Sequence, residues 1–223
     1  ASGTPQLAVS SGSGAVAGTS SYDAATLTVS FVPSSPLTAG TDFTGTVSLD
    51  GTALAGGTWS FTTLATAASA VSFWPDTFTP TYPAWDDPDA VQVGLRFTTS
   101  TAGQVTAIRF YKGAANTGVH TVKLWDGSQT LLASAVSTTE SASGWQTVPL
   151  ASPVSLEAGQ TYTVAYHSST GHYAVEPNGL ATALTAGPLT SAAPGGAYVY
   201  GTGFPGSTSS ASYGVDLVFV PAG

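Results

Sequence analysis

The chain has 223 residues, of which 42% are apolar and only 7% charged, with a formal net charge of −8 and no cysteine. The apolar content is ample for a core and argues against a disordered chain, and the acidic charge argues against nucleic acid and anionic membrane surfaces as partners. The longest apolar runs are far shorter than the roughly 20 residues of a membrane helix, and the lack of cysteine excludes disulfides and thiolate metal sites.

The remaining composition indicates where such a chain works. Thr, Ser and Gly are abundant while Lys and Glu are scarce, which is typical of a secreted or cell-surface protein. The chain starts with Ala-Ser-Gly-Thr-Pro and contains no methionine, so we expect it to be a processed or excised piece of a longer protein.

The first part of the chain contains short alternating segments and no helical periodicity, so we predict an all-β fold. Strands are expected at Thr26–Phe31, Phe43–Leu49 and Thr58–Thr63. The ending Trp59-Ser-Phe61-Thr-Thr63, with these strands, resembles the later strands of a bacterial Ig-like domain over about residues 6–64. The resemblance implies a partial Ig-like module, residues 1–66, that acts as a spacer and exposes edges and apolar faces.

The small, patternless run Ala65–Ala70 is the predicted boundary, and a Pro-rich passage from Trp74 to Pro88 is predicted to be an extended surface loop. Nine further strands are predicted in residues 71–223, which favours an antiparallel, jelly-roll-like two-sheet sandwich. They are Val91–Phe97, Val105–Lys112, His120–Trp125, Leu131–Ala135, Gln146–Leu150, Thr161–His167, Tyr173–Val175, Ala197–Tyr200 and Tyr213–Val220.

Several motifs of this second part occur in the order found in a known family. They include Ile108-Arg-Phe-Tyr-Lys-Gly113, Gly144-Trp-Gln146, Gly171-His-Tyr173 and Tyr213-Gly-Val-Asp-Leu217. Over about residues 71–221 the chain resembles the domain-of-unknown-function family 4082. The resemblance implies a β-sandwich accessory module of large secreted bacterial proteins, often polysaccharide-degrading enzymes.

All four cationic residues, Arg96, Arg109, Lys112 and Lys123, fall in one stretch that is interleaved with aromatics. If Val105–Lys112 and His120–Trp125 pair as a hairpin, alternation places four side chains on one outward strip. A sugar ring would stack on an aromatic of this strip while the cations donate to hydroxyls. The strip consists of Arg109, Tyr111, Lys123 and Trp125. The alternative is that Trp125 packs beneath a loop.

Other polar and aromatic residues are further candidates for ligand contacts. Asn116 and His120 flank the predicted hairpin loop, although an Asn near a Gly also fits a turn with positive φ. Trp145 begins a strand and would either present its ring or close the end of the sandwich. A second polar and aromatic rim is predicted from Tyr166, His167, His172 and Tyr173.

Three carboxylates, Asp86, Asp87 and Asp89, lie just ahead of a predicted strand. Such a concentration is repulsive unless it is solvated or bridged by a cation, and a structural Ca²⁺ suits several oxygen ligands. Asp216 on the last strand would complete this site. A solvated acidic loop, with an Asp216 to Arg96 salt bridge, is the alternative.

The sequence offers little support for an enzyme. It contains no nucleophile elbow, zinc-protease motif or phosphate loop. A zinc site from His167, His172 and Glu176 lacks a helix to align its ligands. The turn residues Glu140, Glu157 and Glu176 have no partner acid for glycoside hydrolysis.

We therefore expect a non-catalytic module that binds a neutral polysaccharide, requires no cofactor and is covalently linked to the catalytic domain of a secreted enzyme. The alternatives are a structural or adhesive spacer at the cell surface, with every aromatic in the core, and a glycan hydrolase.

Overall fold

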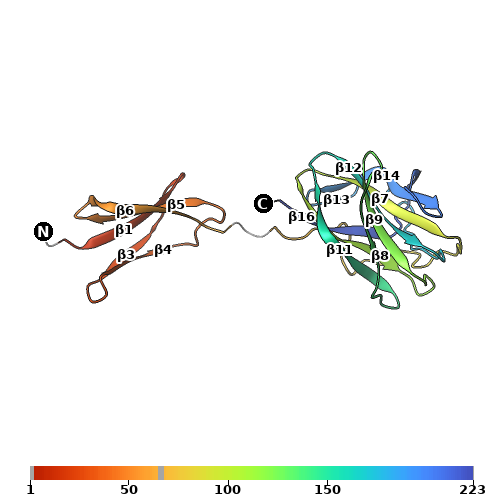
Figure 1. Cartoon of the computed structure of the whole chain (residues 1–223), viewed down its shortest axis with the longest axis horizontal. Helices are drawn as coiled ribbons and strands as arrows, with labels where there is room; N and C mark the ends of the chain where they lie inside the picture. Colours follow the sequence, from red (N-terminus) through yellow and green to blue (C-terminus); the bar gives the residue numbers. More distant parts are fainter. Residues whose placement is uncertain (1–2, 65–67, 223) are drawn as a thin grey trace. The chain divides into compact units, whose positions relative to one another are not determined.

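The computed structural model describes residues 3–64 and 68–222, and the chain divides into two compact units, residues 1–67 and 68–222 (Figure 1). The boundary predicted at Ala65–Ala70 falls partly on residues 65–67, which lie outside this description. Every named element is a strand and every pairing is antiparallel, so the all-β prediction is confirmed. Over the described residues, no helix long and apolar enough to cross a membrane was found.

The first unit has six strands. A four-stranded sheet has the order β2-β1-β5-β6, and β3 pairs with β4 outside it. The strands are β1 (Pro5–Ser11), β2 (Gly14–Ala15), β3 (Gly18–Asp23), β4 (Thr28–Pro33), β5 (Asp42–Leu49) and β6 (Thr52–Thr62). No prediction covered β1 or β3, because their Ser and Gly residues obscure the alternation of apolar side chains.

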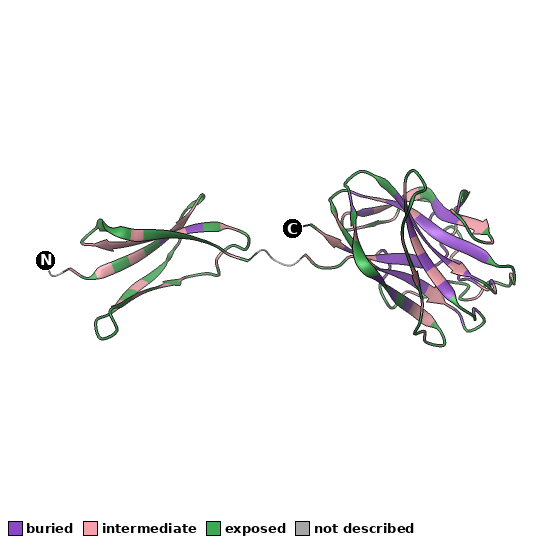
Figure 2. Ribbon diagram, viewed as in Figure 1, coloured by how far each residue is buried: buried purple, intermediate pink, exposed green. Residues whose placement is uncertain are grey.

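The core of the first unit is small. Its fully buried apolar residues are Val9 and Phe43, and the Phe43 ring stacks on Phe61 with centroids 5.6 Å apart. Trp59 is 45% exposed on the edge strand β6, and Figure 2 shows little buried surface in this unit. The Ig-like character of this unit stays a prediction.

The second unit is built from two sheets. The larger has the order β10-β9-β12-β7-β14-β13, with β15 paired to β14, and the smaller has the order β11-β8-β16. The strands are β7 (Val91–Thr99), β8 (Gly103–Lys112), β9 (His120–Asp126), β10 (Leu131–Val136), β11 (Gly144–Leu156), β12 (Thr161–Ser168), β13 (Thr185–Ala186), β14 (Leu189–Tyr200), β15 (Ser207–Ser209) and β16 (Val215–Pro221).

One apolar core joins the two sheets of this unit, as the buried strands in Figure 2 show. Leu95 and Val164 of the larger sheet share it with Ile108 and Leu217 of the smaller. The ring of Phe110 on β8 stacks on that of Tyr166 on β12 at 4.5 Å between centroids. Strands from both sheets are thus interlocked by their alternate side chains, as in a β-sandwich.

The predicted hairpin of β8 and β9 is wrong. Both edges of β8 are already paired, with β11 and β16, while β9 pairs with β10 and β12 in the larger sheet. The connection between them therefore crosses from one sheet to the other. Alternation does turn Arg109 and Tyr111 away from the core, on the outer face of the smaller sheet. It also turns Lys123 and Trp125 away from the core, but on the outer face of the larger sheet.

The predicted strand Tyr173–Val175 is also absent. Gly171 and His172 before it have φ of 64° and 52°, which interrupts extended backbone. This segment instead forms an isolated bridge in which Val175 and Tyr82 exchange backbone hydrogen bonds of 2.8 and 3.0 Å. It thereby fixes the Pro-rich passage against the end of the sandwich.

Candidate ligand-binding site

The exposed aromatic side chains of the second unit lie on the Pro-rich passage and at the end of β14, and a carboxylate links these two segments. Tyr82, Trp85 and Tyr200 are 44%, 41% and 55% exposed, and they are the only large aromatics of this unit's described residues that are so open. The Tyr82 and Trp85 rings meet edge to face at 5.0 Å. The Tyr200 hydroxyl donates to Oδ2 of Asp87 over 2.9 Å. We call Tyr82, Trp85, Asp87, His172 and Tyr200 the aromatic rim.

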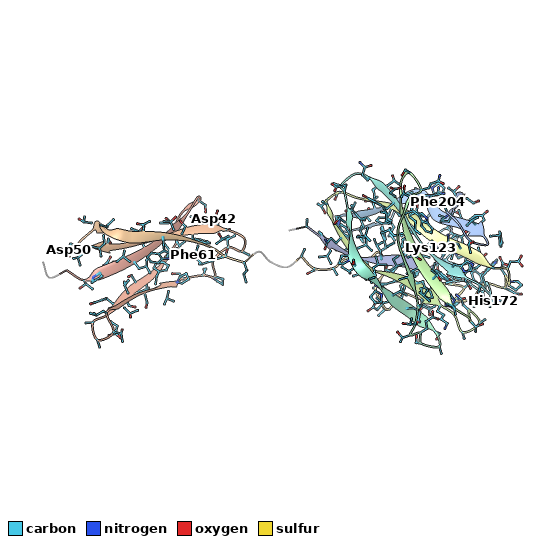
Figure 3. The ribbon with its side chains drawn as sticks, in the orientation of Figure 1. Asp42, Asp50, Phe61, Lys123, His172 and Phe204 are labelled. Carbon is cyan, nitrogen blue, oxygen red and sulfur yellow. The ribbon has the colours of Figure 1, made fainter. Side chains whose placement is uncertain are left out.

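Two backbone features hold the rim in place. The N–H of Trp85 donates to the Tyr173 carbonyl, and the N–H of His172 donates to the Asp87 carbonyl, both over 2.7 Å. A Cβ on Gly171 would lie 2.0 Å from that same Asp87 oxygen, so only glycine permits the close approach of the two loops. Figure 3 labels His172 at one end of the second unit.

Asp87 is an organised acceptor. Its Oδ2 receives the hydroxyls of Tyr200 and Tyr173, and its Oδ1 receives the N–H of Asp89 over 3.1 Å. Burial raises the pKa of Asp87, but these three hydrogen bonds outweigh it and hold the pKa below its usual value. A carboxylate has about four lone-pair positions, so one remains for a ligand hydroxyl.

His172 provides a second acceptor. Its Nδ1 lies 3.2 Å from the Trp85 carbonyl oxygen, which can only accept, so Nδ1 carries the hydrogen. In the neutral ring Nε2 then bears a lone pair. The backbone of His172 has a positive φ, which is uncommon for a non-glycine residue and is often found at binding sites.

Three predicted contact residues lie instead in a buried polar network. Asn116, His120 and Tyr166 are fully buried. The Nδ2 of Asn116 donates to the Tyr166 hydroxyl oxygen over 3.1 Å, and the His120 ring lies between Asn116 Oδ1 at 2.8 Å and Glu140 Oε1 at 2.9 Å. The expectation that these three residues contact a ligand at the surface is therefore wrong, because their polar atoms are used in fixing the connection between β8 and β9.

The charges of this network are coupled. Burial lowers the pKa of His120 and outweighs the opposing effect of Glu140. Burial raises the pKa of Glu140, yet hydrogen bonds from Lys112, at 2.9 Å, and His120 outweigh it and keep that pKa low. The network is a structural support for the loop rather than an open site.

Arg109 is buried on the outer face of the smaller sheet. Its guanidinium lies 4.7 Å from the Trp145 ring centroid, donates to Asp76 over 2.6 Å and lies 3.9 Å from Asp216. The edge of Tyr111 contacts Trp145, whose Nε1 donates to the Phe78 carbonyl over 3.0 Å. The Pro-rich passage thus covers this face. The prediction that Arg109, Tyr111, Lys123 and Trp125 form one open strip is wrong.

Asp216 does not join the other predicted calcium ligands. It is fully buried, and its oxygens accept the N–H groups of Phe73 at 2.9 Å, Trp74 at 3.1 Å and Leu217 at 2.8 Å. Burial raises its pKa despite these bonds and despite Arg109. The predicted convergence of Asp216 with Asp86, Asp87 and Asp89 is therefore not found, and neither is the alternative salt bridge with Arg96, which donates to the Gly206 carbonyl over 2.8 Å.

The other acidic and histidine candidates are also dispersed. Among the residues that the structure describes, no group of three or more His, Asp or Glu side chains is arranged to hold a metal ion. Glu176, a candidate for both zinc binding and hydrolysis, accepts hydrogen bonds from the N–H and hydroxyl of Thr81.

Lys123 and Trp125 lie on the outer face of the larger sheet. Trp125 is covered by Phe204, whose ring meets it edge to face at 5.8 Å, in agreement with the alternative that Trp125 packs beneath a loop. The Lys123 ammonium lies 5.9 Å from the Trp125 ring centroid.

Among the predicted residues, the rim brings together Asp87 and His172, with the buried Tyr173 beneath them. Sequence reasoning missed Tyr82, Trp85 and Tyr200. A signal existed for two of them, because Tyr82 and Trp85 lie in a Pro-rich passage that was already predicted to be at the surface. Nothing local marked Tyr200, which ends a strand.

A hollow elsewhere on the surface has another character. This hollow of about 430 Å³ lies between Leu132–Ser134 and Leu150–Val154 and is lined by neither aromatic nor charged side chains. Such a lining offers no stacking surface and no charged partner.

Comparison with known protein families gives a match over most of the second unit. The family model described as Domain of unknown function (DUF4082) matches residues 77–215, which include the rim residues and every strand of the second unit except most of β16. No curated protein matches the chain.

Proposed function

The chain belongs to the DUF4082 family, and we propose that its second unit is a non-catalytic module that binds a neutral polysaccharide at the aromatic rim. The proposal includes an extracellular location and a covalently linked catalytic domain, in keeping with a composition rich in Thr, Ser and Gly.

One observation carries the proposal. Among the described residues of the second unit, the three most exposed aromatic side chains lie on segments joined at Asp87: Tyr200 bonds to its carboxylate, and the ring of Trp85, two residues before it, contacts Tyr82. Aromatic rings are ordinarily buried, as Tyr166 and Tyr213 are in the core and Trp125 is beneath Phe204. Rings that are left open beside fixed acceptors mark a binding surface.

The chemistry of the rim favours hydroxyl-bearing ligands. Asp87 and His172 present acceptors, which pair with the hydroxyl hydrogens of a sugar. The rings of Tyr82, Trp85 and Tyr200 offer apolar surface for the C–H faces of the same sugar. Asp86 and Asp89 lie beside them and repel anions, so a neutral glycan is the best match.

A binding surface whose rings are about half exposed gives modest affinity. We expect dissociation constants from micromolar to millimolar, about −8 to −4 kcal/mol. Repeated units along a polysaccharide would raise the retention of the whole enzyme on its substrate.

The test is retention of the full chain on a panel of neutral insoluble polysaccharides. Trp85→Ala should weaken binding at least about tenfold, because a central ring is removed. Trp59→Ala is the matched control, since Trp59 is similarly exposed at 45% but lies in the first unit. Its binding should equal that of the unchanged chain.

Two outcomes would contradict the proposal. Equal losses in the two variants, or no retention on any polysaccharide, would favour the structural or adhesive spacer. Release of soluble sugar from the panel would favour a hydrolase.

A further inference from the structure

The cations of the second unit are divided between two situations. Arg109 pairs with Asp76 and Asp216, and Lys112 pairs with Glu140. Arg96 and Lys123 have no carboxylate within salt-bridge distance among the described residues, and both lie on the outer face of the larger sheet. In a chain of net charge −8, this face therefore presents two cations that no carboxylate of the described residues contacts directly.

Strand register places Lys123 in a polar row. Lys123 is opposite Ala165 on β12, so His167, two residues further on, is its diagonal neighbour on the same face. His167 is opposite Gln92 on β7. Lys123, His167 and Gln92 thus cross three adjacent strands, and we call them the cationic row. Figure 3 labels Lys123 near the middle of this unit.

A short glycine-rich segment, Gly201–Gly206, crosses the same face. Its carbonyls at Pro205 and Gly206 accept from Arg96, and Phe204 covers Trp125. The Nε2 of Gln92 donates to the Gly203 carbonyl, while its Oε1 is buried without a hydrogen-bond partner. The segment therefore uses Arg96 and the amide nitrogen of Gln92, but gives no hydrogen bond to Lys123, His167 or Gln92 Oε1 among the described residues.

The polar groups of the cationic row that lack a partner indicate which class of ligand this face would bind. The Lys123 ammonium and the His167 ring are partly exposed and can bind an anion, whereas Gln92 Oε1 is fully buried and lacks a donor. A carboxylate supplies the anion, and a hydroxyl beside it would supply that donor once a shift of Gly201–Gly206 lets it reach Gln92. We propose that the cationic row binds a uronic acid residue of an acidic glycan, at a site separate from the rim.

The electrostatics agree with this assignment. Burial lowers the pKa of Lys123. Burial is also the largest cause of the lowered pKa of His167, and the charges of Lys123 and His120 lower it further. A bound carboxylate would relieve both effects, because an adjacent negative charge favours the protonated forms.

The probe is trigalacturonate, titrated into the full chain and followed by calorimetry and by the NMR signals of His167 and Lys123, with cellotriose as the neutral ligand of equal length. We expect trigalacturonate to shift these signals and cellotriose to leave them unchanged. Affinity should fall as salt rises from about 50 to 300 mM.

Matched variants separate a specific site from general attraction. Lys123→Met should weaken trigalacturonate binding about tenfold or more, whereas Lys123→Arg keeps the charge and most of the affinity. Lys112→Met removes the same charge from another surface and should change the affinity less than threefold, about 0.65 kcal/mol. Melting temperatures verify that each variant is folded.

Three results would overturn the inference: equal affinity of Lys123→Met and the unchanged chain, equal binding of sulfate, or loss of trigalacturonate binding in Trp85→Ala. The last would place the acidic sugar at the rim. Failure of neutral polysaccharides to bind the rim would leave the cationic row unaffected, so the two proposals fail independently.

Discussion

The hydroxyl of Tyr200 donates to Oδ2 of Asp87 over 2.9 Å, which joins the end of β14 to the loop that precedes β7. This bond connects a ring that is open to solvent with a carboxylate that is already organised by Tyr173 and Asp89. The rim therefore has its geometry before any ligand arrives, which reduces the entropy lost on binding.

Tyr200→Phe keeps the ring and removes only the hydroxyl. We expect a stability loss of at most about 1 kcal/mol in urea unfolding, because a partly exposed hydrogen bond contributes little. Polysaccharide retention should change less than threefold, whereas Tyr200→Ala should weaken it about tenfold. Equal retention in the two variants would mean that the ring makes no contact.

The stability that the hydrogen bond between Tyr200 and Asp87 contributes should decrease in acid, as the direction of the pKa shift of Asp87 requires. The pKa of Asp87 is lower in the folded chain than its ordinary value of about 3.9. The contribution of the ionised Asp87 to the free energy of unfolding is therefore fully present above about pH 3.9, and it is lost as pH falls through the pKa of Asp87 in the folded chain. The difference in melting temperature between the unchanged chain and Tyr200→Phe should be constant from pH 5 to 7 and shrink in stronger acid.

Gly171→Ala tests the close approach of the two loops. Its Cβ would lie 2.0 Å from the Asp87 carbonyl oxygen, and its φ of 64° is itself unfavourable for alanine. Gly159→Ala is matched, because Gly159 has φ of 75° but nothing within 4 Å of its Cβ. We expect a loss of about 1 kcal/mol at Gly159 and more than about 3 kcal/mol at Gly171 in urea unfolding. Similar losses at both positions would show that the loops adjust freely.

Arg109→Met leaves the carboxylate of Asp216 buried without its cation. Removing one member of a buried pair is expensive, so we expect a loss of about 3 kcal/mol in free energy of unfolding. Asp76→Asn removes the exposed partner of the same guanidinium and should cost less than about 1 kcal/mol, although that hydrogen bond is the shorter one. The reverse order of losses would contradict the burial argument.

His120 should titrate below its ordinary pKa of about 6.5, as followed by its ring proton NMR signal, because burial disfavours the charged ring. Because the pKa of His120 is lowered in the folded chain, the contribution of the neutral ring to the free energy of unfolding is complete above about pH 6.5. It is lost as pH falls through the pKa of His120 in the folded chain. His120→Gln should therefore reduce the slope of stability against pH just below 6.5. It should not abolish that slope, because His167 has a lowered pKa of the same sign.

The effect of Glu140 is separable from that of His120. Its pKa is also lowered, so its contribution is lost only in stronger acid, below about pH 4.3. A His120 signal that titrates above 6.5 would instead show that the charge of Glu140 dominates over burial.

The sequence by itself determined most of the longer strands of the second unit and the direction of their side chains, although it missed β13 and β15 and added a strand at Tyr173–Val175. Alternation correctly turned Ile108 and Phe110 toward the core and Arg109 and Tyr111 away from it, because the two faces of a strand follow from its period of two residues. The Pro-rich passage was likewise correctly expected at the surface, although its first residue, Trp74, is buried.

Only the tertiary structure decided which sheet each strand joins and what covers each outer face. The connection after Lys112 fits a hairpin or a crossing between sheets equally well, and its residues do not distinguish the two. Trp125 faces outward by parity yet is enclosed by Phe204, almost 80 residues later in the chain, while Tyr200 is open. Exposure depends on contacts between distant segments, which local alternation does not encode.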